Sequence, residues 1–170
     1  MKPRYYQQEA HDKAIEHAKK SLEPQVLSLP CGAGKSFIIA MIAKSLHEIS
    51  GKKILVTAPG SKLCIQDYKK YRGLGMPASV FSAGAGSKDL RHPVVFGTVL
   101  TLINSKDRLK GYSAIIIDEC FTGDTLIKTP NGDKRIDSLC VGDLVYNAVG
   151  SGNIERIFFS IKKETYTVSL

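Results

Sequence analysis

The amino-acid sequence predicts an α/β domain with a parallel sheet covered by helices, followed by an all-β segment. Three observations support this prediction. Over residues 1–119, continuous apolar runs of strand length alternate with helical periodicity, which is typical of parallel strands buried on both faces. After residue 120, helical periodicity does not return, and short strand-like runs are separated by turn residues. The charge also changes there, because residues 1–119 hold 18 basic and 10 acidic residues, whereas residues 120–170 hold 6 of each.

The first part begins with a helix and continues as alternating strands and helices. Apolar residues at three- and four-residue spacing predict an amphipathic helix over residues 6–20, which Glu23-Pro24 ends. Apolar runs predict four strands, at residues 26–29, 54–58, 94–96 and 114–117. Each of the first two strands is followed by a further predicted helix, at residues 35–49 and 62–71.

The second part predicts a series of short strands. Strand-like residues 125–129 and 134–136 flank Pro130-Asn131-Gly132-Asp133, which predicts a hairpin with an Asn-Gly turn. Further strands are expected at residues 144–146, 154–161 and 165–170, with Gly150-Ser151-Gly152 as a turn. The domain boundary is therefore placed between residues 119 and 120.

Composition excludes several classes of protein. With 170 residues, 43% of them hydrophobic and 24% charged, the chain can bury a core, so disordered and collagen-like classes are excluded. The four cysteines form no CxxC pair or zinc-spaced cluster, and Cys140 is interpreted as a small core residue. No apolar run has the ~20 residues of a membrane span, so we expect a cytoplasmic protein with no membrane partner. The net charge of +8 favours nucleic acid as a partner, with a solvated basic face as the alternative.

A phosphate-binding loop is the strongest motif. Residues 29–36 read Leu-Pro-Cys-Gly-Ala-Gly-Lys-Ser between a predicted strand and a predicted helix. The loop of Gly32, Ala33 and Gly34 would present backbone N–H groups to phosphate oxygens at the helix N-terminus. Lys35 would reach the terminal phosphates, and the Ser36 hydroxyl would ligate Mg²⁺. The strict pattern has Gly at position 29, and an ordinary glycine turn is the alternative interpretation.

An acidic pair supplies the second half of such a site. The apolar run of residues 115–117 ends in Asp118-Glu119, roughly 80 residues after the loop. Asp118 would hold Mg²⁺ through water, and Glu119 would activate the attacking water. Without the loop, the pair would more simply be a solvated strand end.

Together these residues resemble the first RecA-like domain of superfamily 2 helicases, the group whose acidic motif reads Asp-Glu-x-His. The resemblance covers residues 3–119. Arg4-Tyr5-Tyr6-Gln7 is similar to the family's adenine-recognising segment, which implies that Gln7 reads the adenine edge; a solvated polar residue is the alternative. Residues 55–59 are similar to motif Ia, and residues 96–100 to a segment that contacts the nucleic-acid backbone. The resemblance implies ATP and Mg²⁺ as cofactors and nucleic acid as partner, with DNA favoured over RNA.

The helicase pattern stops at Cys120. Phe121 stands where the family has His, and Ser-Ala-Thr is absent from residues 121–170. Residues 120–132 instead resemble the first conserved block of inteins, the self-splicing Hint domains, and residues 137–146 resemble their next strand segment. This resemblance implies that the Cys120 thiol attacks the carbonyl of Glu119 in an N-to-S acyl shift. The intein Thr-x-x-His segment and terminal Asn do not occur in the chain.

We therefore expect a helicase N-terminal extein, residues 1–119, joined to an N-terminal intein (Hint) fragment, residues 120–170. If the intein is split, a complementary C-terminal intein fragment with its C-extein is the partner. The end of the chain within an apparent strand favours a truncated gene instead. A stand-alone NTPase with a β-rich appendix, a basic nucleic-acid-binding module with a vestigial loop, and a divergent linker after residue 119 are the alternatives.

Overall fold

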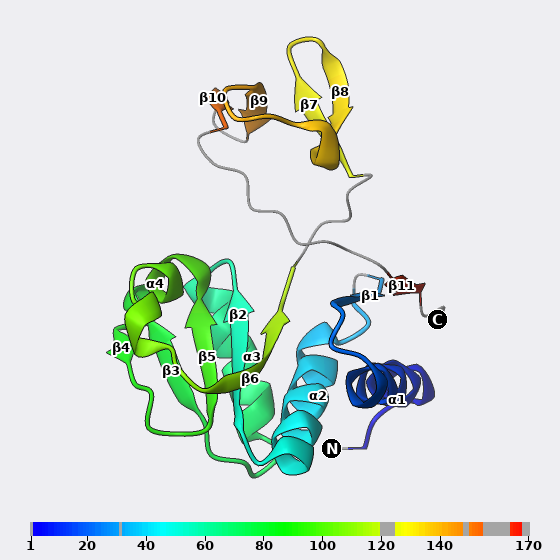
Figure 1. The fold of residues 1–170 in the computed structure, drawn as a ribbon, viewed down its shortest axis with the longest axis vertical. Helices are drawn as coiled ribbons and strands as arrows, with labels where there is room; N and C mark the ends of the chain where they lie inside the picture. Colours follow the sequence, from blue (N-terminus) through cyan, green and yellow to red (C-terminus); the bar gives the residue numbers. More distant parts are fainter. Residues whose placement is uncertain (1, 31, 120–124, 148–149, 155–163, 168–170) are drawn as a thin grey trace. The chain divides into compact units, whose positions relative to one another are not determined.

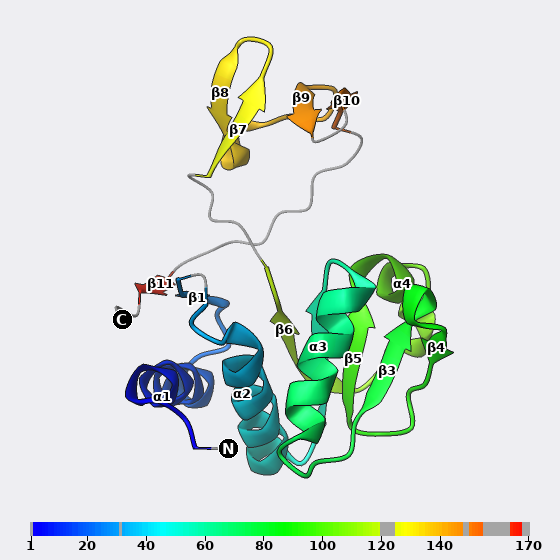
Figure 2. The ribbon, with the colours of Figure 1, turned by 180° about the vertical axis from the view of Figure 1, so that it is seen from behind.

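The computed structural model describes residues 2–30, 32–119, 125–147, 150–154 and 164–167 (Figures 1 and 2). The chain forms two compact units. Unit 1 comprises residues 1–119 and 162–170, and unit 2 comprises residues 120–161. Within the described ranges, no helix combines the length and apolar character needed to cross a bilayer.

Unit 1 is built on a five-stranded sheet of order β4-β3-β5-β2-β6. Neighbouring strands are parallel except for the short β4, which runs antiparallel to β3. Thr57 pairs with Ile117, and Ala58 pairs with Thr98, so the carboxyl ends of the three neighbouring strands β5, β2 and β6 meet at one edge. The bounds are β2 (Lys53–Ala58), β3 (Ser79–Ser82), β4 (Ser87–Lys88), β5 (Val94–Thr98) and β6 (Tyr112–Ile117).

Helices cover the two faces of this sheet unequally. One face packs on α2 (Lys35–Ser50) and α3 (Ser61–Arg72) around Ile54, Val56 and Phe96, and α1 (Tyr5–Lys20) packs on the outer side of α2. The other face carries a smaller cluster of Leu55, Phe81 and Val95, to which α4 (Val99–Ile103) contributes Leu102. Short 3₁₀ helices occur at Ala83–Ala85, Lys106–Arg108 and Ile136–Ser138.

The predicted α/β class and its three long helices are confirmed, but burial on both faces is wrong for the outer strands. β1 (Gln25–Ser28) lies outside the five-stranded sheet and pairs in parallel with β11 (Glu164–Thr167). At β6, Ile115 and Ile117 are 61% and 56% exposed. The reason is that β6 is the edge of the sheet, and no described residue buries its Ile115 and Ile117 side chains.

Unit 2 contains two antiparallel hairpins within its described residues. β7 (Leu126–Thr129) pairs with β8 (Gly132–Arg135), and β9 (Leu144–Asn147) pairs with β10 (Gly150–Asn153). The predicted Asn-Gly turn is wrong by one residue, because Gly132, with φ +97°, already begins β8 and the connection is Pro130-Asn131. The Thr129 hydroxyl supports this tighter turn by accepting the N–H of Asn131 at 3.3 Å.

Two further expectations for unit 2 need correction. The Gly150-Ser151-Gly152 segment is strand rather than turn, because its backbone pairs with β9. Cys140 is exposed rather than in the core, which is reached instead by its neighbour Leu139, 6% exposed. The strand expected at residues 154–161 lies outside the described residues except for Ile154, which is not in a strand.

Candidate nucleotide-binding site

The loop between β1 and α2 has a backbone that only glycine adopts easily. Gly32 and Gly34 have φ values of +80° and +77°, and Gly34 is the residue that caps the N-terminus of α2. Its carbonyl accepts the N–H groups of Phe37 at 2.9 Å and Ile38 at 3.3 Å. The first turn of α2 contains no acidic side chain. The first turn therefore adds no negative charge of its own to the positive end of the helix, which is suited to an anion.

The side chain of Gln7 connects α1 to this loop. Its amide Nε2 donates to the carbonyl of Ala33 at 2.9 Å, and its Oε1 accepts the backbone N–H of Arg4 at 3.0 Å. A Cβ atom on Gly34 would lie 2.7 Å from Nε2, so a side chain at this position would require the Gln7 amide to move. Both ends of the Gln7 amide are thus engaged by the protein. Reading of adenine by Gln7 stays a prediction, and the structure adds a role in holding the loop.

Ser36 and the acidic pair meet where the loop approaches the carboxyl ends of the strands. The Ser36 hydroxyl is buried and accepts a hydrogen bond from Nε2 of Gln66, on α3, at 2.7 Å. Asp118 is also buried, and its N–H donates to the carbonyl of Thr57 at 2.8 Å, which extends the sheet ladder beyond β6. Burial raises the pKa of the Asp118 carboxyl, the charge of Glu119 adds to this, and the charge of Lys35 opposes it. Lys35 therefore lies near enough to Asp118 for their charges to interact.

A third carboxyl, Asp67 on α3, was not predicted from the sequence. It is 0% exposed, and burial raises its pKa to about 6. The Ser36 hydroxyl lowers this pKa and the Asp118 carboxyl raises it, so both groups lie close to Asp67. The signal was present, because Asp67 falls at helical spacing between Cys64 and Tyr71, which are both buried. An acid on the apolar face of a helix needs an explanation.

Glu119 differs from its neighbour in exposure and backbone conformation. Its side chain is exposed, and with φ +59° it is the only non-glycine with positive φ among the described residues. Such a conformation is uncommon for residues with a Cβ atom and costs about 1–2 kcal/mol. Cys120, predicted as the nucleophile, lies outside the described residues.

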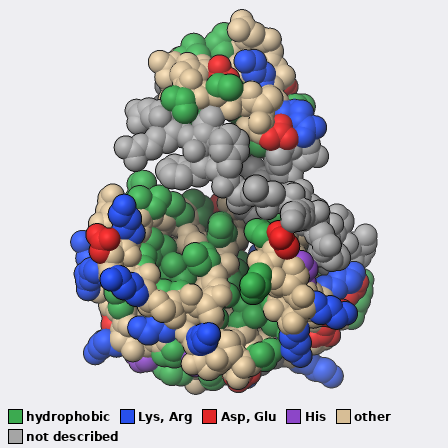
Figure 3. All heavy atoms as spheres, viewed as in Figure 1, with side chains coloured by type: hydrophobic (Ala, Val, Ile, Leu, Met, Phe, Trp, Pro, Cys, Tyr) green, Lys and Arg blue, Asp and Glu red, His purple; other side chains and the backbone are tan. Residues whose placement is uncertain are grey.

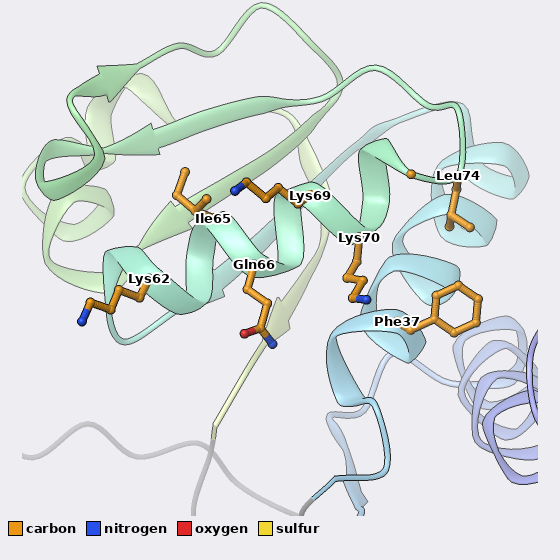
Figure 4. A pocket seen from close by; sticks show the side chains of 8 residues that line it. Phe37, Lys62, Ile65, Gln66, Lys69, Lys70 and Leu74 are labelled. Carbon is orange, nitrogen blue, oxygen red and sulfur yellow. The ribbon is translucent and has the colours of Figure 1, made fainter. Parts of the chain in front are cut away.

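A groove adjoins the loop on the side of α3. Its volume is about 490 Å³. It is lined by Phe37 of α2 and by residues of α3 and of the turn that follows it (Figure 4): Lys62, Ile65, Gln66, Lys69, Lys70, Gly73 and Leu74. Gln66 belongs to both the groove and the site, since it also binds Ser36. The groove is lined by the apolar side chains of Phe37, Ile65 and Leu74 and by three lysines. On the opposite face, seen in Figure 3, Lys and Arg side chains are also spread over unit 1.

The predicted nucleic-acid segment, residues 96–100, comprises the end of β5 and the start of α4 at the same edge of the sheet. Thr98 is buried, and its hydroxyl donates to Ser82 at 3.2 Å and lies 2.9 Å from the hydroxyl of Thr101. The next residues are open, with Leu100 73% exposed. The structure thus brings this segment, the loop and the acidic pair to one side of unit 1.

The described residues hold no group of three or more His, Cys, Asp and Glu side chains placed to bind a metal by themselves. Ser36 and Asp118 nevertheless fit a shared metal. Both are buried oxygen donors, and Mg²⁺ is usually held by one or two carboxylates together with substrate phosphates and waters.

The family model described as type III restriction enzyme, res subunit, matches residues 1–125. The ATP-dependent DNA helicase uvsW of Enterobacteria phage T4 is 30% identical over 128 residues, which are 71% of this chain and 24% of that protein. The crystal structure of the UvsW helicase from bacteriophage T4 matches with a TM-score of 0.59 and 26% identity, over 72% of this chain and 45% of that one. The chain spans less than half the length of these relatives.

Proposed function

We propose a function for unit 1 from the premise that this chain belongs to the family described as type III restriction enzyme, res subunit. Unit 1 binds ATP·Mg²⁺ and nucleic acid as the first RecA-like domain of a superfamily 2 helicase. One observation supports this most strongly. The positive end of α2 follows a loop with two left-handed glycines, and its Ser36 and the buried Asp118 both lie close to Asp67. This is the arrangement that phosphates and a metal require together.

Each residue of the loop and of the acidic pair would have a role that follows from its chemistry. Backbone N–H groups of Gly32, Ala33 and Gly34 would bind the phosphate oxygens, and the exposed Lys35 would reach the terminal ones. The Ser36 hydroxyl would ligate the metal directly, and Asp118 would hold it through water. When bound, Mg²⁺ neutralises phosphate charge. Glu119 would take a proton from the attacking water at its exposed carboxylate.

DNA is the polyanion that we propose for this domain. The basic excess lies wholly in residues 1–119, and the similar uvsW protein is described as a DNA helicase. Contacts of Lys and Arg with phosphates are independent of sequence. We therefore expect unit 1 to bind DNA without sequence specificity. We also propose the cytoplasm as the compartment of this protein.

Binding of a fluorescent ATP analogue with Mg²⁺ tests the nucleotide site. The wild-type chain should give saturable binding, and Lys35→Ala should abolish it, because the terminal phosphates lose their cation. Lys52→Ala removes an exposed lysine away from the loop and is the matched control. Equal binding by wild type and Lys35→Ala would mean that the loop is not the site.

For unit 2 we propose the N-terminal part of an intein. The support is the resemblance of residues 120–132 and 137–146, together with the left-handed backbone of Glu119 directly before Cys120. In the proposed step the Cys120 thiolate attacks the Glu119 carbonyl carbon. The C–N bond breaks, a C–S thioester forms, and the Cys120 nitrogen takes up a proton.

Trapping the thioester tests this chemistry once a complementary C-terminal intein fragment is supplied in trans. Incubation with excess dithiothreitol should release residues 1–119, which intact-mass spectrometry detects. Cys120→Ala should prevent release because it lacks the thiol, whereas Cys140→Ala should not. Release from the Cys120→Ala variant would show that cleavage has another origin.

A further inference from the structure

Asp67 is buried without a partner. Its exposed fraction is zero, and neither carboxyl oxygen has a hydrogen bond of good geometry to a described residue, although the Ser36 hydroxyl and the Asp118 carboxyl lie close enough to shift its pKa. Among the buried side chains that lack a partner in the described structure, it is the only one that carries a charge. Burying a carboxylate without donors is strongly unfavourable.

The surroundings of Asp67 add negative charge. The charges of Asp118 and Glu119 both act on it, and its carboxyl and that of Asp118 are close enough to share a hydrogen bond. The neighbouring Gln66 amide donates to Ser36 and not to Asp67. Among basic side chains, the charge of Lys35 lowers the pKa of Asp118. The two buried carboxyls, Asp67 and Asp118, are therefore left with an excess of negative charge when both are ionised, whereas Glu119 is exposed to solvent.

A cation at Ser36 and Asp118 would remove this excess. Direct ligation by all three acids does not fit, because no such cluster of ligands exists in the described residues. Mg²⁺ retains several of its waters, and these are strong hydrogen-bond donors. A metal-bound water can therefore supply the donor that Asp67 lacks.

We propose that Asp67 is a positioning residue for the metal of the nucleotide site: it accepts a hydrogen bond from a water on the Mg²⁺ that Ser36 and Asp118 hold. This role rests on the proposed binding of ATP·Mg²⁺. It places a third element, α3, in contact with the metal, in addition to the loop before α2 and the end of β6.

The test compares Asp67→Asn with wild type in two measurements. In the first measurement, Mg²⁺ is titrated into a mixture of the chain and a fluorescent ATP analogue. In the second, thermal unfolding of the chain is followed in EDTA. The Mg²⁺ concentration at half-saturation should rise about tenfold, as is common when a partner of a metal ligand is replaced. Affinity for the analogue in EDTA should not fall. The unfolding midpoint in EDTA should stay equal or rise, because a buried charge has been removed.

Asp107→Asn, at an exposed acid on the 3₁₀ helix Lys106–Arg108, is the matched control and should change neither quantity. If the Mg²⁺ dependence of Asp67→Asn is unchanged, the proposed role of Asp67 is overturned. The proposed nucleotide site still stands in that case, provided that wild type binds the analogue. A lower unfolding midpoint in EDTA also overturns it, since Asp67 would then be a structural core residue. Absence of Mg²⁺-dependent binding in wild type overturns both proposals together.

Discussion

Gly34 occupies a position that is constrained twice, by its backbone and by its neighbour. Its φ is +77°, and an added Cβ would lie 2.7 Å from Nε2 of Gln7. The first constraint is local and could be inferred from the Gly-Lys-Ser motif. The second joins residues far apart in the chain, so it emerged only from the structure.

We expect Gly34→Ala to lower the free energy of unfolding by more than the ~1–2 kcal/mol of a left-handed alanine, because Gln7 must also move. Urea unfolding measures this. Gly51→Ala is the control, since Gly51 has φ +63° but no atom within 4 Å of an added Cβ. Equal losses for the two variants would contradict a contact between Gln7 and the loop.

The two cysteines within the described residues should differ sharply in reactivity. Cys64 is 1% exposed, and burial raises the pKa of its thiol to about 11, so little thiolate is present at pH 8. Cys140 is exposed. Iodoacetamide followed by peptide mapping should label Cys140 in the folded chain and Cys64 only after unfolding. Labelling of both at one rate would show that α3 does not bury Cys64.

At the scale of elements, the sequence predicted the segments that carry their own periodicity. The helices at α1, α2 and α3 repeat apolar residues over several turns, and the strands β2 and β5 are continuous apolar runs. β3 was missed because only two apolar residues, Val80 and Phe81, lie between serines. β10 was predicted as a turn because it contains two glycines. Its strand conformation comes from backbone pairing with β9, which the residues of β10 alone do not indicate. Edge position is likewise a property of the sheet, so the exposure of β6 could not be inferred from its residues.

The contrast between central and edge strands predicts how substitutions act. Ile54→Ala, at a residue 0% exposed in β2, should lower the free energy of unfolding by about 2–5 kcal/mol, because it leaves a cavity. Ile115→Thr, at a residue 61% exposed in β6, should change it by no more than about 0.5 kcal/mol. Urea unfolding of both variants checks this. A large loss at Ile115 would mean that this face of β6 is covered.

For the whole molecule, the uneven distribution of charge predicts a salt-dependent affinity for DNA. Residues 1–119 carry a net charge of +8 and residues 120–170 carry none. Fluorescence anisotropy with labelled DNA of two unrelated sequences should give similar affinities. Both should fall at least about tenfold between 50 and 200 mM salt, as counterion release predicts. A flat response to salt would argue against an electrostatic contact.

The loop and acidic pair could be predicted from the sequence because each motif is contiguous. Asp118 ends β6 of the five-stranded sheet, whereas Lys35 and Ser36 follow β1, which lies outside that sheet, so these residues converge through the packing of α2 and α3 against the sheet. Helical spacing indicates that Asp67 lies on the apolar face of α3, but the membership of Asp67 and Gln66 in the site could not be predicted, since α3 reaches Ser36 only through tertiary packing.

The hydrogen bond from Gln7 to Ala33 makes α1 and the phosphate loop thermodynamically dependent on each other. A ligand that orders the loop must, by reciprocity, strengthen the docking of α1 to the same extent. Nucleotide would then slow amide hydrogen exchange in α1, a helix that supplies no phosphate ligand. Conversely, a protein that pulled α1 away would loosen the loop and favour release of the nucleotide.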